Sequence, residues 1–422
     1  MESLRWHTPM FRRKNEIPEK RGNMQNILAI GFDTRNIVCS ASRAGYTVCS
    51  IDAFRDLDLQ KCAYASALLE CRTSSELHQL DPRWIIAQMN AFGLDFDAIV
   101  PGSGMEMLDS CSFSCPVLAS CPDAVKEASN KLHLAKKLEA LGMPHPHCYS
   151  PEELDAIEYP VILKPASGGG GIFNRVAKNR QELLSALEEL SRLDPEFIEK
   201  EVVIQEFLEG IPSSVSLLST KNQALAVAIN EQLIGTPWLS RLPFAYCGNV
   251  TPFRTAHAEE MEALAEELVL KLGLLGSNGV DFLATEKGPV VLEVNPRFQG
   301  SLDTIEMSTG INLFEAHIGC FGGELPEKPE AKTFAARGVL YSDRELFIDR
   351  KLMNVILREK SADIPSMGTV TEPDWPLTSL FACASTKDEA ILSLERGAER
   401  IKTFIANRTK EERKPLNPAG KA

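Results

Sequence analysis

Two acidic residues and an asparagine in the stretch GVDFLATEKGPVVLEVNPRFQGS, residues 279–301, have the types and spacing of a metal site. Two apolar segments flank a Glu-Lys-Gly turn, which predicts a β-hairpin. With a three-residue loop at 286–288, Asp281 lies directly opposite Glu293, and Asn295 lies on the same face as Glu293. Opposed like charges destabilise a sheet, and a bound cation removes that conflict. Oxygen ligands of this kind favour Mg²⁺, or Mn²⁺, completed by water and by the phosphates of a nucleotide.

The same hairpin admits a second interpretation. A two-residue loop changes the register, and the acids are then hydrated side chains on a strand that faces solvent. Arg297 follows Pro296 directly, and in the metal-site interpretation it projects toward the same anions and stabilises the charge of a transition state.

A lysine and four glycines follow one another in VILKPASGGGGIF, residues 161–173. Lys164 precedes a proline and is therefore expected at the end of an extended segment. The glycines Gly168, Gly169, Gly170 and Gly171 can expose successive backbone N–H groups without a Cβ in the way, which suits phosphate oxygens. The stretch predicts a phosphate-binding loop, with a flexible surface loop as the alternative. The sequence has no GxxxxGK[ST] motif, which excludes a P-loop.

An apolar strand that ends in acidic residues lies between these two motifs, in VIQEFLEG at 203–210. We expect this segment to contact the adenosine part of a nucleotide, through Glu206 and the backbone near Phe207 and Leu208 at the base and through Glu209 at the ribose. Gln205 is included in the same predicted contact region. Acidic strand ends are common, so taken alone this motif is also compatible with a simple surface strand.

The elements that position these residues fall into three units. Residues 26–52 read as strand, helix and strand, and with the apolar run that ends at Gly102 they predict a small parallel sheet of the Rossmann-like type. Only one glycine of a GxGxxG pattern is present, so a dinucleotide site is not expected. Strands and helices then alternate from 161 to 295 in an α+β layout, and a last unit of mixed strands ends in a helix.

Bulk composition excludes several classes of protein. The chain has 422 residues and a net charge of -13, which disfavours nucleic acid as a partner. No apolar run is long enough to span a bilayer, and the first residues lack the apolar core of a secretory signal, so a cytoplasmic protein without a membrane partner is expected. The eleven cysteines include no CxxC pair, which fits neither a disulfide framework nor a zinc ribbon.

Taken in order, these motifs resemble the ATP-grasp superfamily, which includes biotin carboxylase, carbamoyl phosphate synthase and many carboxylate-amine ligases. The resemblance rests on Lys131 before a helix that ends in GMPHP, the lysine of VILKP, the GGGG loop, QEFLEG, the acid of GVDF, and LEVNPR. It spans roughly residues 25–320 and is nearest to the predicted ATP-dependent carboligases related to biotin carboxylase.

The resemblance implies a domain order. A disordered arm at 1–23 precedes a Rossmann-like pre-ATP-grasp domain at 24–118. A two-lobed ATP-grasp domain at 119–325 follows, then a mixed C-terminal subdomain at 326–408 and a disordered tail at 409–422.

The resemblance also implies roles for single residues. It assigns Lys131 and Lys164 to the nucleotide phosphates, with Lys164 and Arg297 as catalytic groups. The magnesium ligands are Asp281, Glu293 and Asn295.

The implied activity is that of an ATP-dependent ligase. MgATP phosphorylates a small carboxylate, and an amine or other nucleophile then attacks the acyl phosphate, which releases ADP and phosphate. The acceptor is expected to enter beside the N-terminal unit, near Tyr246 and Asn249. The alternative is an ATP-binding regulatory or scaffold protein without turnover. Small carboxylates and amines are the expected partners, and a homodimer is compatible with the family.

Overall fold

The computed structural model describes residues 11–12, 24–71, 77, 80–150, 153, 155–193 and 202–412. Most of the expected arm at 1–23 lies outside these residues, but Phe11–Arg12 form strand β1 and pair with Ala65 and Ser66. The tail from 413 onward also lies outside them, whereas 409–412 continue the last helix. No helix in the described part of the chain is long and apolar enough to cross a membrane.

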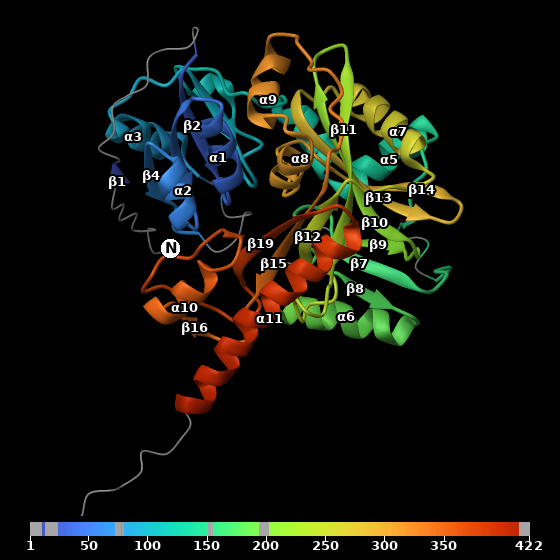
Figure 1. The fold of residues 1–422 in the computed structure, drawn as a ribbon. Helices are drawn as coiled ribbons and strands as arrows, with labels where there is room; N and C mark the ends of the chain where they lie inside the picture. Colours follow the sequence, from blue (N-terminus) through green and yellow to red (C-terminus); the bar gives the residue numbers. More distant parts are fainter. Residues whose placement is uncertain are drawn as a thin grey trace, which may run out of the picture.

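The N-terminal unit is a five-stranded sheet in the order β1-β4-β3-β2-β5, in which β4, β3, β2 and β5 are parallel (Figure 1). Its strands are β2 (Asn26–Gly31), β3 (Thr47–Asp52), β4 (Ala65–Leu68) and β5 (Ala98–Pro101), and its helices are α1 (Arg35–Arg43), α2 (Leu57–Cys62) and α3 (Pro82–Phe92), with a 3₁₀ turn η2 (Ser110–Ser112). The parallel sheet predicted from residues 26–104 is therefore present. Its carboxyl edge carries the loops that follow β2, β3 and β5.

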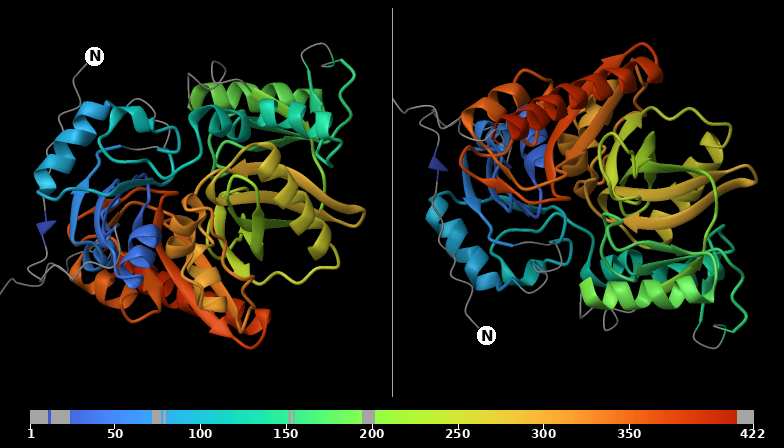
Figure 2. Two further views of the ribbon diagram at one scale, coloured as in Figure 1. Left: turned by 90° about the horizontal axis from the view of Figure 1, so that it is seen from above. Right: turned by 90° about the horizontal axis from the view of Figure 1, so that it is seen from below.

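Two helices connect this unit to a small lobe. They are α4 (Pro122–Ser129) and α5 (Lys131–Leu141). The side chain of Asn130 caps α5 by accepting from two backbone N–H groups, and Gly142 ends the helix in the left-handed conformation at φ +67°. The lobe itself is a four-stranded antiparallel sheet of β6 (Cys148–Tyr149), β9 (Val202–Glu206), β7 (Val161–Pro165) and β8 (Arg175–Ala177), covered by α6 (Arg180–Leu193). Figure 2 shows this lobe as a layer of its own.

An eight-stranded antiparallel sheet forms the centre of the molecule, in the order β14-β13-β10-β11-β12-β15-β19-β17. Its strands are β10 (Ile211–Ser219), β11 (Ala224–Ile234), β12 (Tyr246–Thr251), β13 (Gly276–Thr285), β14 (Gly288–Asn295), β15 (Phe334–Tyr341), β17 (Ser361–Ala362) and β19 (Pro376–Ala384). Its helices are α7 (Ala258–Lys271), α8 (Leu302–Thr309), α9 (Leu313–Phe321), α10 (Arg350–Ile356) and α11 (Lys387–Glu412), and a small ribbon pairs β16 (Leu346–Phe347) with β18 (Val370–Thr371). Because β12 pairs with β15, the C-terminal strands β15, β19 and β17 belong to the central sheet.

The β13–β14 hairpin has a different turn from the predicted one. Thr285 pairs with Gly288, so the loop has two residues, Glu286 and Lys287, and the predicted loop at 286–288 is wrong. The register then shifts between Asp281 and Phe282, which leaves Leu292 as an extra residue on β14. This bulge restores the pairing of Asp281 with Glu293.

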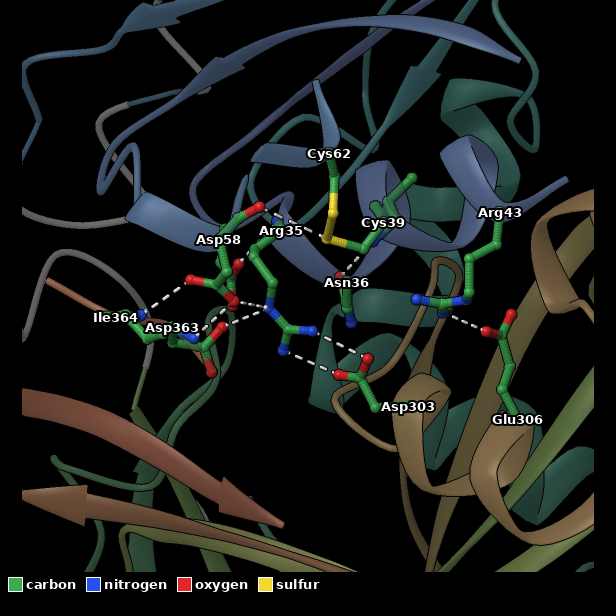
Figure 3. The surroundings of a disulfide bond; sticks show 12 residues. Arg35, Asn36, Cys39, Arg43, Asp58, Cys62, Asp303, Glu306, Asp363 and Ile364 are labelled. Carbon is green, nitrogen blue, oxygen red and sulfur yellow. Dashed lines mark hydrogen bonds and ion pairs between the residues drawn. A yellow bond between two sulfur atoms is a disulfide. The ribbon is translucent and has the colours of Figure 1, made fainter. Parts of the chain in front are cut away.

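A buried ion-pair network holds the N-terminal unit against the central sheet (Figure 3). Arg35 on α1 donates two hydrogen bonds of 2.8 Å to the carboxylate of Asp303 on α8 and one of 2.6 Å to Asp363 beyond β17. Asp58 on α2 accepts from the backbone N–H groups of Asp363 and Ile364, both at 3.0 Å. Burial alone would raise the pKa of Asp363, but Arg35 and Arg337 outweigh it and hold that pKa well below its usual range. The network therefore joins α1 and α2 of the N-terminal unit to α8 and to the segment that follows β17.

One disulfide is present that the sequence did not indicate. Cys39 on α1 and Cys62 at the end of α2 are bonded beside Arg35 and Asp58 (Figure 3). The remaining described cysteines are free thiols. The bond joins the two helices that carry the N-terminal half of the ion-pair network.

His317 on α9 joins three parts of the fold. Its Nδ1 accepts from the backbone N–H of Ser277 at 2.9 Å, and its Nε2 lies 3.2 Å from the carbonyl oxygen of Leu118. The ring also packs on Phe298 and Phe321. Burial lowers the pKa of His317 to about 4, because a charged ring would be desolvated.

We expect His317 to make the protein sensitive to acid. Between its unfolded pKa near 6.5 and its folded pKa of about 4, the unfolded chain binds the proton and the folded chain does not. The free energy of unfolding therefore falls as pH drops through this window, by up to about 1.4 kcal/mol per pH unit, and is unaffected above it. Urea unfolding of His317→Asn should show a shallower pH slope than the wild type. The exposed His133→Asn is the control, and equal slopes for all three proteins would contradict the prediction.

Candidate active site

A cavity of about 1280 Å³ lies between the small lobe, the central sheet and the N-terminal unit. All the residues that the sequence singled out for nucleotide, metal and catalysis line it: Lys131, Lys164, Gly168, Gly169, Gly170, Gly171, Gln205, Glu206, Phe207, Leu208, Glu209, Asp281, Glu293, Asn295 and Arg297. They come from the start of α5, from β7 and the loop after it, from the end of β9 and the residues that follow it, and from the β13–β14 hairpin and the residues just beyond it. The structure therefore brings three separate sequence motifs to one space.

Asp281 and Glu293 face each other across the hairpin inside this cavity. Burial, together with the charge of Glu293, raises the pKa of Asp281 to about 7, even though Gln232 donates to Asp281 Oδ1 at 3.0 Å. Asn295 also contacts this acid, donating from Nδ2 to Asp281 Oδ2 at 3.3 Å. Two carboxylates and an amide thus meet on one wall of the cavity.

Two lysines supply positive charge on the other side of Glu293. Lys131 Nζ lies 3.1 Å from Glu293 Oε2 and donates to the carbonyl oxygen of Gly168 at 2.9 Å. Lys164 is 7% exposed, and burial together with the charge of Lys131 lowers its pKa to about 8. Two buried ammonium groups side by side repel one another, so an anion between them is favourable.

The glycine loop requires glycine for two different reasons. Gly168, Gly170 and Gly171 have φ of +96°, +81° and +72°, a region that residues with a Cβ rarely adopt. At Gly171 a Cβ would also lie 2.0 Å from the carbonyl oxygen of Phe244, whereas at Gly170 it would meet open space. The loop thus packs on the segment before β12 while its other glycines face the cavity.

The end of β9 offers polar groups at the far wall of the small lobe. Gln205 is 4% exposed, and its Oε1 is buried without a hydrogen-bond partner. The carboxylate of Glu206 accepts from the backbone N–H of His147 at 3.3 Å. An unpaired buried acceptor that lines a cavity is suited to a ligand donor such as an amino group.

Arg297 does not point freely into the cavity. Its Nε lies 2.9 Å from Glu106 Oε1 of the N-terminal unit, and its Nη2 donates to Asn295 Oδ1 at 3.1 Å. Glu106 was not expected from the sequence, since nothing in PGSGMEM places it opposite LEVNPR. This ion pair holds the guanidinium group beside the acid pair and links it to the N-terminal unit.

The two residues expected near the acceptor behave differently. Tyr246 lines the cavity, and burial raises its pKa to about 12. Asn249 does not line it: the residue is fully buried and hydrogen-bonds Tyr246, Thr251 and Thr304. Asn249 is therefore a structural residue beneath Tyr246, and its prediction as an acceptor contact is wrong.

Sequence reasoning missed the second half of the cavity. Its walls include Asp33 and Asp56 from the N-terminal unit, Arg337 from β15, and Phe54 and Trp375. Asp33, Phe54 and Asp56 had a signal in the sequence, because they follow predicted parallel strands and ligands bind at the carboxyl ends of such strands.

The donor set fits a hard divalent cation. Asp281, Glu293 and Asn295 offer oxygen ligands, and burial together with the charge of Glu293 raises the pKa of Asp281 to about 7, so a cation bound here would stabilise its carboxylate. Within the described residues no group of three or more histidine, cysteine, aspartate or glutamate side chains is arranged for a metal, so any ion here would need ligands from a bound substrate. This combination is typical of Mg²⁺ held together with a nucleotide.

We expect Gly171→Ala to weaken nucleotide binding as well as stability. The Cβ collides with Phe244 and displaces the loop, in addition to the left-handed strain of about 1–2 kcal/mol. Gly323→Ala is the matched control, because Gly323 has φ +84° and open space around the position of a Cβ. Calorimetric titration with MgADP should show an affinity at least about fivefold lower for Gly171→Ala only. Unchanged affinity in that variant would contradict the prediction.

Comparisons with known proteins agree with this geometry. A family model described as an ATP-grasp domain matches residues 128–301. An uncharacterized protein of Methanocaldococcus jannaschii is 26% identical over 87% of this chain and 90% of its own length. The carbamoyl phosphate synthase large chain of Pyrococcus furiosus is 30% identical over 53% of this chain, and the D-alanine–D-alanine ligase of Pediococcus pentosaceus is 27% identical over 33%. The chain spans only 22% and 39% of the lengths of these last two relatives.

The solved structures show the same fold. A biotin carboxylase complex from Campylobacter jejuni superimposes with a TM-score of 0.68 and 17% identity, over 91% of this chain and 97% of that chain. The expected fold class is confirmed, with a Rossmann-like N-terminal sheet before the two lobes. The chain therefore has the ATP-grasp fold, and its residues 128–301 match the family model of the ATP-grasp domain.

Proposed function

We propose that this protein is an ATP-dependent ligase that activates a small carboxylate as an acyl phosphate and joins it to an amine. The carboxylate oxygen attacks the γ-phosphorus of ATP, the bond to the bridging oxygen breaks, and ADP leaves. The amine then attacks the acyl carbon and loses a proton, and phosphate leaves with the oxygen that came from the carboxylate. No covalent enzyme intermediate is required, so positioning and charge neutralisation carry the catalysis.

The single observation that supports this proposal most strongly is the meeting of the acid pair and the lysine pair in one cavity. Glu293 contacts Lys131 directly, and Lys131 also binds the glycine loop through Gly168. MgATP carries a negative triphosphate beside a divalent cation. The two lysines complement the triphosphate, and the acid pair complements the cation. The relatives with named activities are a synthase and a ligase, which is compatible with this chemistry.

Each part of the site has a distinct task in the proposal. Lys131 and Lys164 hold phosphate oxygens, the glycines of the loop donate backbone N–H groups to them, and Gln205 accepts from the adenine. Arg297, oriented by Glu106, stabilises negative charge on the transferring group. A magnesium ion at Asp281, Glu293 and Asn295 would neutralise charge on the phosphates as it develops.

The cavity has room for more than a nucleotide. Its second half reaches the N-terminal unit, with Tyr246 and Arg337 in its walls, and we place the carboxylate and the amine there. A regulatory protein that only binds ATP would need no such second compartment, which makes the ligase the favoured function.

We expect Glu293→Gln to reduce carboxylate-stimulated ADP formation by at least about a hundredfold, because it removes one anionic ligand of the metal and the partner of Lys131. Glu286→Gln, in the exposed turn of the same hairpin, is the control and should retain full activity. The assay supplies MgATP, pooled small carboxylates and hydroxylamine, which traps an acyl phosphate as a hydroxamate.

Three results would contradict the proposal. Full activity of Glu293→Gln would remove the acid pair from the chemistry. Release of AMP in place of ADP would indicate adenylation. Nucleotide binding without any carboxylate-stimulated ADP across a broad panel would favour the regulatory alternative.

A further inference from the structure

The end of the cavity remote from the glycine loop is built by the N-terminal unit. Asp33 follows β2, and Phe54, Arg55 and Asp56 lie between β3 and α2; all four line the cavity. The carboxyl edge of a parallel sheet is where such folds bind ligands. The residues predicted to bind the nucleotide lie at the other end of the cavity. The end at the N-terminal unit is therefore available to a second ligand.

Asp56 is a buried carboxylate without a partner. It is 7% exposed and lines the cavity, and although it stands at the N-cap position of α2 its side chain makes no cap hydrogen bond. Among the described residues no donor or cation contacts its carboxylate. Burial raises its pKa well above the usual value, and four neighbouring acids add to that rise. Such a group is costly unless a cation reaches it.

The nearby cations are already engaged. Arg35 binds Asp303 and Asp363, and Arg337 binds the other oxygen of Asp363. The guanidinium group of Arg55 donates from its Nε to the hydroxyl of Ser66 at 3.2 Å. Within the part of the chain that the structure describes, no ion pair joins Asp56 to a cationic side chain.

Two neighbouring acids, Asp52 and Asp33, differ in how many hydrogen bonds the protein gives to their carboxylates. Asp52 is saturated by the backbone N–H groups of Thr34, Phe54 and Arg55 and by the Thr34 hydroxyl. Asp33 accepts a hydrogen bond at 3.2 Å from the backbone N–H of Arg35. Burial and the acids around it raise the pKa of Asp33 to about 7, although the charges of Arg35 and Arg337 act in the opposite direction. Of the described residues at this end of the cavity, Asp33 and Asp56 are thus carboxylates that can still accept hydrogen bonds from a ligand.

Three aromatic rings line the same cavity as these two acids. Phe32 and Phe54 pack edge to face with their centroids 5.1 Å apart, and Phe54 packs on Trp375 at 6.4 Å. All three rings line the cavity. Aromatic faces attract organic cations and exclude water, which strengthens a nearby ion pair.

From this arrangement we infer that the N-terminal end of the cavity binds the amine substrate as a primary ammonium ion with an apolar body, held by Asp56 and Asp33 and flanked by Phe32, Phe54 and Trp375. The inference rests on the proposed ligase function and names the class of its nucleophile. A metal ion is the other cation to consider, but the described residues hold no group of three or more acidic, histidine or cysteine side chains arranged for one. The bound ammonium ion becomes a nucleophile by giving one proton to one of these carboxylates, which leaves a neutral amine and a protonated carboxyl group.

Binding of simple probes to the full chain tests this inference. With MgADP present, calorimetric titration compares benzylammonium chloride with benzyl alcohol, its neutral isostere. The wild type should prefer the ammonium ion, and Asp56→Asn should bind it at least about tenfold more weakly, as expected for loss of a charge-assisted hydrogen bond. Asp33→Asn is a second variant with the same expectation. Glu70→Gln, an exposed acid of the same unit, is the control and should bind like the wild type.

Measurements of Tm and of MgADP affinity distinguish failure of this inference from failure of the proposed ligase function. Asp56→Asn should keep its MgADP affinity and raise Tm, because the amide has no ionised form that is costly to bury. Glu293→Gln should lose MgADP affinity yet still bind benzylammonium, so failure of the proposed function and failure of this inference are distinguishable. No preference for the ammonium ion over the alcohol in the wild type, or full ammonium affinity in both Asp56→Asn and Asp33→Asn, would overturn the inference.

Discussion

The constraint on which the site depends is a single extra residue in strand β14. With the two-residue turn that the hairpin adopts, regular pairing would place Leu292 opposite Asp281 and send Glu293 to the other face of the sheet. The bulge at Leu292 brings Glu293 opposite Asp281, against the electrostatic preference of the sheet. A bound cation would remove the repulsion between the two carboxylates, which is why we propose one here.

The surrounding elements maintain this costly arrangement. Lys131 balances Glu293 from α5, Gln232 hydrogen-bonds Asp281 from β11, and Glu106 orients Arg297 from the N-terminal unit. Arg35 fixes that unit to the central sheet through two buried carboxylates. Rigid support of this kind is what an active site needs when its catalysis consists mainly of positioning.

The sequence predicted those parts of the fold that depend on local pattern. The helix that begins at Lys131, the strand that ends beside Lys164 and the strands of the hairpin all occur where periodicity and turn residues indicated. The predicted pairing of Asp281 with Glu293 is present, but it was derived from a loop of the wrong length. Periodicity predicts neither the turn type nor the bulge that restores this pairing. Contacts between distant segments, such as Arg297 with Glu106 or Cys39 with Cys62, had no sequence signal at all. Asn249 was misjudged because burial depends on the tertiary position of β12.

A crystal structure of the protein with MnADP tests the central claim most directly, since the anomalous signal of manganese locates the ion without reference to any assumed ligand. The account predicts a manganese peak between the carboxylates of Asp281 and Glu293, with the diphosphate beside residues 168–171 and Lys164. Manganese bound elsewhere, or a nucleotide away from the glycine loop, would contradict it.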